Sequence, residues 1–175
     1  MAKYNIGISI LDTRDLHQSA STPIQTRHYV VGSKDYFMQV SWNFAFGTSL
    51  HYTLSQIQED INKLVAGRDS ILIVHRGKND HRLLEAAKVN IQPLYTLDTR
   101  DATQHIFELD SRCTLQQILS LLEIPYDPEM LGNTGNIANF TSRAMLLLAV
   151  LGTKKLEQEE QGQNPSPRTG KLSVL

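Results

Sequence analysis

Histidine and carboxylate side chains lie close together around residue 80, and their types are suited to holding a metal ion. His75 ends an apolar run, and Asp80 and His81 stand side by side a few residues later. Imidazole nitrogens and carboxylate oxygens are common protein ligands of metal ions. Two histidines at the end of a strand are more often ordinary polar residues, however, and we favour that interpretation.

A second chemically active pair follows the first apolar run of the chain. Asp12 and Arg14 are two residues apart, so an extended strand places them on the same face. A guanidinium can hold a carboxylate with two parallel hydrogen bonds, so we expect Arg14 to pair with Asp12 or Asp80. Alternatively, Asp80 is simply a helix N-terminal residue, favoured there by the helix dipole.

The elements that must position these residues are read from hydrophobic periodicity. Strands are expected at residues 4–11, 27–31, 36–45, 70–75 and 92–97, and helices at 53–66, 79–88, 102–107, 114–122 and 138–151. Short links predict that the first three strands are antiparallel, with two parallel strands following. Gly135 and Asn136 are expected to form a turn with positive φ before the last helix. This order predicts an α/β fold with a mixed sheet and helices on both faces.

Composition limits the class of protein. The chain has 175 residues, a length that suits one domain, which we expect at 1–152. Its single cysteine, Cys113, excludes an internal disulfide. The net charge is −1. Residues 153–175 are rich in Gln, Glu, Pro and Ser, which predicts a disordered tail. We find no signal peptide and no run long enough to span a bilayer, so a cytoplasmic or nuclear protein is expected, not a secreted or membrane-bound one.

Three segments in order resemble the DEDDh 3′–5′ exonucleases, a family with an RNase H-like fold. They are Ile8–Arg14, Ile73–Leu84 and Gly132–Ala138; the last is similar to the family's His-Asn-Ala-Gly-Asn-Asp-Ala block at four of seven positions. The segment Asn43–Ser49 resembles an element of a fungal branch tied to RNA silencing and mRNA export. The resemblance covers about residues 4–151 and implies an RNase H-like domain.

The resemblance also implies a catalytic site, and this chain departs from it. Such nucleases bind two Mg²⁺ or Mn²⁺ ions through four carboxylates and use a histidine as base. Asp12 and Asp80 match the first and third carboxylates, but Arg14 replaces the Glu, Ile137 the last Asp and Gly132 the His. The remaining groups Asp12, Arg14 and Asp80 sum to −1 against the +4 of two metals, and a permanent cation repels a metal. We therefore expect no metal cofactor and no catalysis.

Three functions compete. The first is an inactive nuclease-like domain that serves as a protein-interaction or scaffolding module in an RNA-related pathway, with a protein partner or a second copy of itself. The second is a non-catalytic RNA or DNA binder that uses Arg14, Arg76, Lys78 and Arg82 in the old substrate cleft, against which the near-neutral net charge argues. The third is an active exonuclease with substitute ligands, drawn from Asp15, Asp98 and Asp101.

Overall fold

The computed structural model describes residues 3–14, 24–77, 80, 82, 84–85, 88–89, 91–160 and 162. Asp15, Lys78 and His81 lie outside the described residues, as do parts of the helix expected at 79–88 and most of the expected tail. Every structural statement below refers to the part of the chain that is described.

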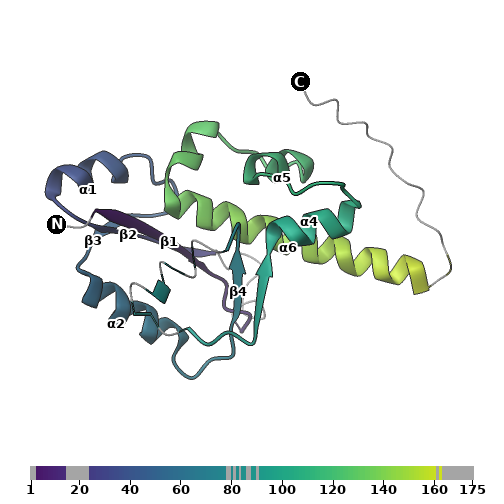
Figure 1. The fold of residues 1–175 in the computed structure, drawn as a ribbon, viewed down its shortest axis with the longest axis horizontal. Coiled ribbons are helices and arrows are strands. Elements are labelled where there is room, and N and C mark those ends of the chain that lie inside the picture. The colour runs from purple at the N-terminus through teal and green to yellow at the C-terminus, as the bar shows by residue number, and fades with distance from the viewer. Residues whose placement is uncertain are drawn as a thin grey trace.

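The strands form two small sheets (Figure 1). In the first, β1 (Tyr4–Ile10) pairs antiparallel with β2 (Gln25–Val31), which pairs parallel with β3 (Ser49–His51). In the second, β4 (Ile71–Val74) pairs parallel with β5 (Tyr95–Asp98). The predicted mixed α/β architecture is confirmed, and so is the parallel pairing of the last two strands.

The third predicted strand is wrong, because much of the segment 36–45 is helical. Helix α1 (Lys34–Ser41) begins where the Ser33 side chain accepts a hydrogen bond from the Tyr36 backbone amide at 3.3 Å. Alternation of apolar and polar residues suggested a strand, but this cap and the acidic Asp35 in the first turn favour a helix. The intervening helix lets the chain return in the same direction, so the third strand is β3, which the sequence did not predict, and it pairs parallel with β2 instead of antiparallel as expected of a third strand at 36–45.

Helices cover both faces of the first sheet, as predicted (Figure 1). On one face, α2 (Leu54–Val65) packs Ile57 and Ile61 against Ile6 and Tyr29. Its start is fixed by a capping box in which Thr53 and Gln56 each accept from the other's backbone amide. On the opposite face lies α6 (Thr134–Glu160). Alternating residues of β1 and β2 thus face α2 on one side of the sheet and α6 on the other, where Gly7 and His28 lie against the start of α6.

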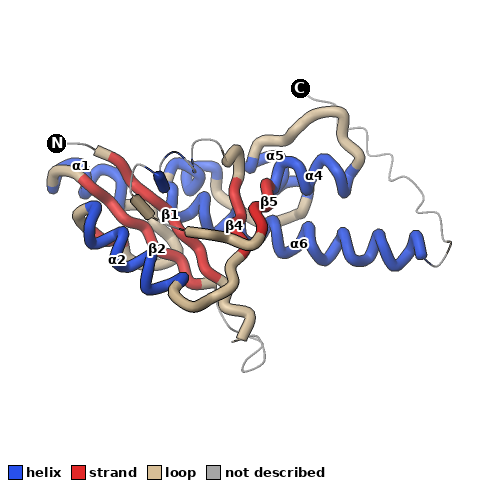
Figure 2. Tube along the Cα trace, turned by 60° about the horizontal axis from the view of Figure 1, so that its bottom comes forward, coloured by secondary structure: helices blue, strands red, loops and turns tan. Residues whose placement is uncertain are grey.

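The second core lies against the N-terminal half of α6. It is made by α5 (Leu115–Leu121) and α6, with the short 3₁₀ helix η2 (Pro128–Gly132) packed beside them. Helix α4 (Thr99–Phe107) also packs on α6. α6 continues to Glu160, past the predicted domain boundary at residue 152, and its C-terminal half extends away from the strands (Figure 2). No described helix is both long and apolar enough to cross a membrane.

His28 on β2 is buried beneath the start of α6, and this predicts a pH dependence of stability. Its Nδ1 lies 2.8 Å from Ser49 Oγ, while its Nε2 has no hydrogen-bond partner in the described structure. Burial lowers the pKa of His28 to about 4, below the ordinary value near 6.5. The unfolded chain therefore binds a proton first as the pH falls from about 6.5 to about 4, and roughly 3 kcal/mol of stability is lost over that window.

Urea unfolding at a series of pH values, followed by circular dichroism, measures this loss. A His28→Gln variant is the control, because its side chain does not titrate. The free energy of unfolding of the wild-type chain should fall more steeply below pH 6.5 than that of the variant. Identical slopes in the two proteins would contradict a buried neutral His28.

Candidate functional site

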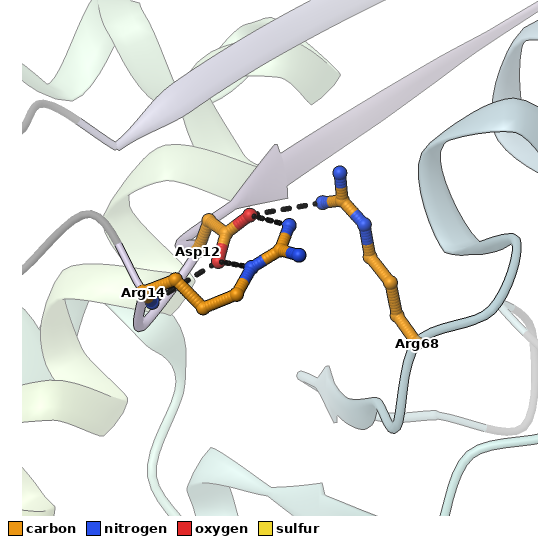
Figure 3. Close-up of polar contacts among 3 residues, drawn as sticks. All are labelled: Asp12, Arg14 and Arg68. Atoms are coloured by element: carbon orange, nitrogen blue, oxygen red, sulfur yellow. Dashed lines mark hydrogen bonds and ion pairs between the residues drawn. The ribbon is translucent and has the colours of Figure 1, made fainter.

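Asp12 is held by Arg14 in the turn that follows β1. The Arg14 backbone amide and Nε donate to Asp12 Oδ1 at 3.1 and 2.9 Å, and Nη2 donates to Oδ2 at 2.6 Å (Figure 3). Two parallel guanidinium bonds of this kind are the strongest carboxylate pairing that side chains offer. The prediction that Arg14 pairs with Asp12 is confirmed.

Arg68 is a second cation on the same carboxylate, and the sequence did not point to it. It lies between α2 and β4, and its Nη1 donates at 3.1 Å to Asp12 Oδ2, the oxygen that also accepts from Arg14 Nη2 (Figure 3). Hydrogen bonds from Arg14, together with the charges of Arg14 and Arg68, hold the pKa of Asp12 well below its usual range. The three side chains carry a net charge of +1, and both carboxylate oxygens accept from guanidinium groups.

Asp80 stands beyond the other end of β4. Arg68, which contacts Asp12, precedes this strand, whereas Asp80 follows it and is exposed. Asp12 thus contacts the segment just before β4, whereas Asp80 lies in the segment just after β4. Asp80 also has an interaction of its own within the fold.

The segment Gly132–Ala138, the third block that resembles the family, keeps residues that pack and cap helix α6 but lacks the family's histidine and last aspartate. Asn133 caps α6, because its Oδ1 accepts from the amides of Gly135 at 2.9 Å and Asn136 at 3.3 Å. Gly132 is exposed at the end of η2, and Ile137 packs against the second core. The positions of the expected histidine and last aspartate therefore carry neither a base nor an oxygen ligand.

Gly135 and Asn136 belong to the first turn of α6, so the predicted positive-φ turn is wrong. A Cβ at Gly135 would lie 2.9 Å from His28 Cβ and 2.6 Å from the Phe44 ring, so only glycine fits. Asn136 is fully buried; its Oδ1 accepts from Ala45 N at 2.9 Å, and its Nδ2 donates to Asn43 O at 2.8 Å and Met130 O at 3.0 Å. The two residues dock α6 on the sheet and on the segment that follows α1.

The residues present do not fit a pair of divalent metals. Mg²⁺ and Mn²⁺ need several oxygen ligands, and of the family positions only Asp12 and Asp80 supply a carboxylate. The oxygens of Asp12 already accept from Arg14 and Arg68. Within the described residues, no group of three or more His, Cys, Asp or Glu side chains is placed to hold a metal ion. The chain's own donor set therefore argues against two-metal chemistry.

The other candidate ligands have roles within the fold. Asp98 caps α4, accepting from the Arg100 amide at 2.9 Å, and Asp101 pairs with Arg112 at 2.8 Å. His75 Nδ1 lies 2.8 Å from Thr99 Oγ1, and burial lowers the pKa of His75, which favours the neutral ring. These contacts explain their presence without a metal.

Of the four basic residues proposed to bind nucleic acid, the structure describes Arg14, Arg76 and Arg82 but not Lys78. Arg76 follows β4 with a positive φ of 66° and is exposed, and Arg82 is exposed as well. Arg14 is also exposed, but its guanidinium is committed to Asp12. The described structure thus brings Arg14 together with Arg68, a cation that the sequence prediction omitted.

Comparison with known proteins identifies the family. Residues 4–148 match the model of the DEDDh_C family, the DNA polymerase III subunit epsilon-like, C-terminal domain. Among curated proteins, no sequence matches. The matched range begins at β1 and ends within α6, so it contains both sheets and the third block, and the α/β structure is consistent with the RNase H-like fold that the motifs implied. The chain belongs to the DEDDh_C family.

Proposed function

We propose that this chain is a catalytically inactive member of its family that serves as a protein-interaction module. The observation that supports the loss of catalysis is the state of Asp12: Arg14 and Arg68 donate to both of its oxygens, where the family would place metals. A charge of +1 on these three groups opposes a divalent cation. Three of the five family positions also have a different chemistry, since Arg14, Gly132 and Ile137 provide neither carboxylate nor imidazole.

The second sheet supports the interaction role. Its side chains include Ile71 and Tyr95, which are opposite each other in the register, and Leu97 on the same strand as Tyr95. All three are exposed, Tyr95 to 66%. Contiguous exposed apolar side chains mark protein-protein contact sites more often than nuclease clefts, which are basic. A protein partner that covers β5 would bury them.

Site-specific crosslinking tests the interaction role. A photoreactive benzoyl-phenylalanine replaces Tyr95 in the full chain, and a matched variant carries it at Gln116, an exposed polar position on α5. In cells that naturally contain the chain, illumination should give a protein adduct from position 95 and far less from position 116. Equal yields, or no adduct at either position, would count against an interaction surface on β5.

A second candidate function is non-catalytic binding of RNA or DNA, and the convergence of Arg14 and Arg68 favours it. Two guanidiniums beside one carboxylate leave a net positive charge that a backbone phosphate can contact. Single-stranded RNA binding measured against salt concentration tests it with Arg14→Glu and Arg68→Glu. Binding that weakens with salt and is lost in both variants would support this function, while unchanged binding would exclude a role for the pair.

A further inference from the structure

A groove lies between the C-terminal end of α1 and η2, away from Asp12. It is open to solvent, has a volume of about 520 Å³, and is lined by Gln39, Val40, Trp42, Asn43, Glu129 and Gly132. We call it the Trp42 groove. Trp42 is the single tryptophan of the chain and is 73% exposed. Met38 lies one helical turn earlier and is also exposed, so both present apolar surface on one side of α1.

The walls of the Trp42 groove are fixed by hydrogen bonds. Asn43 Nδ2 donates to Glu129 O at 3.0 Å, which ties the α1 side to η2. Beneath them, Asn133 Nδ2 donates to Val40 O at 2.9 Å and Asn136 Nδ2 to Asn43 O at 2.8 Å. A groove that is already ordered loses little conformational freedom when an occupant binds.

The chemistry of the lining indicates a basic, proline-containing occupant. An exposed indole ring packs well against proline rings and against a guanidinium plane. Of the six lining residues, which are all described, only Glu129 has an acidic or basic side chain. An occupant with an arginine next to prolines therefore matches both the ring and the charge.

The chain itself contains such a segment at residues 163–175. It includes Pro165, Pro167, Arg168 and Lys171 and no acidic residue, so its side chains carry a net charge of +2. We propose that the segment around Pro165–Arg168 of one copy of this chain binds the Trp42 groove of a second copy. In this complex the proline rings contact Trp42, and the Arg168 guanidinium pairs with Glu129.

The length of α6 requires that the Trp42 groove and the Pro165–Arg168 segment that binds it belong to different copies of the chain. The groove adjoins the start of α6, whose 27 residues span about 40 Å. From Gly162 to Arg168 the chain can reach at most about 22 Å, even fully extended. α1 and the C-terminal end of α6 lie at opposite ends of the molecule (Figure 1). A copy therefore cannot fill its own groove with this segment.

Helix α6 also offers a surface on which the two copies of the dimer can contact each other. Leu146, Leu147 and Val150 are exposed apolar residues near its midpoint. Thr134 and Glu160 are both about 20 Å from Leu147 along the helix, so two antiparallel α6 helices crossing there bring each C-terminal segment near the other groove. The result is a closed two-fold dimer in which both copies make the same contacts.

Self-association of the full chain tests the proposal, with Trp42 fluorescence as a second readout. Sedimentation equilibrium should show a monomer–dimer equilibrium for the wild-type chain, and Trp42 emission should shift with protein concentration. Arg168→Glu and Glu129→Arg should each weaken the dimer by about tenfold or more, because each places like charges together. The double variant Glu129→Arg/Arg168→Glu restores an opposite-charge pair and should recover the dimer. Asp110→Arg, an exposed charge change outside the groove, should have no effect.

A wild-type chain that remains monomeric at every concentration overturns the proposal. So does a dimer that both single charge reversals leave intact. The inference extends the proposed interaction role but does not depend on the loss of catalysis. If the chain cleaved nucleic acid, the proposal of an inactive site would be wrong, but the dimer would be unaffected. If the chain were monomeric, the dimer would be wrong, but the ion pairs of Asp12 would still argue for an inactive site.

Discussion

Gly7→Ala is expected to destabilise the fold by about 3 kcal/mol or more, because the added methyl group has no room. A Cβ at Gly7 would lie 1.9 Å from the backbone oxygen of Thr134 and 2.6 Å from the amide nitrogen of Gly135. These are main-chain atoms at the start of α6, so relief requires that the whole helix move away from β1. Urea unfolding monitored by circular dichroism gives the free energy of unfolding.

Gly132→Ala is the matched control for Gly7→Ala. Its added Cβ would meet nothing within 4 Å, and Gly132 is exposed at the end of η2. We expect its free energy of unfolding to stay within about 0.5 kcal/mol of the wild type. If the two variants proved equally stable, α6 would not pack directly on β1 at this point.

Asn136→Ala is expected to have the second large effect, again about 3 kcal/mol or more. Its loss leaves the Ala45 amide and the Asn43 and Met130 carbonyls without their partner, and each buried unsatisfied group costs about 1–3 kcal/mol. Asn43→Ala removes one side-chain bond near the surface and should cost about 1 kcal/mol. Thermal and urea unfolding of both variants measure the difference. Equal losses would show that Asn136 does not dock the segment after α1.

Hydrophobic periodicity and helix-capping residues predicted some helices and strands well. α2 was expected at 53–66 and runs from Leu54 to Val65, because an apolar stripe and a capping box act within one segment. The alternation at 36–45 indicated a strand, yet the cap at Ser33 starts a helix there. A period-two pattern in a segment that is only partly buried is thus a weaker signal than a cap followed by an acidic first turn.

The candidate site shows which part of a site the sequence can predict. The pairing of Asp12 with Arg14 was predicted from a shared strand face; the structure has the pair, but in the turn that follows β1. Arg68 was not predicted, because it lies 56 residues away and the approach of the β4 entry to the end of β1 is a tertiary contact. Gly135 and Asn136 were expected in a turn, since their glycine and amide chemistry is typical of turns. Only the structure shows that both are buried in a helix against neighbours distant in sequence.

The most direct test of the central claim is a cleavage assay on 5′-labelled single-stranded RNA and DNA with Mg²⁺ or Mn²⁺. The wild-type chain is compared with an Asp12→Ala/Asp80→Ala double variant, which removes the two retained family carboxylates. We predict no cleavage by the wild-type chain, or the same trace of cleavage in both proteins. Stepwise shortening from the 3′ end by the wild type that disappears in the double variant would contradict an inactive site.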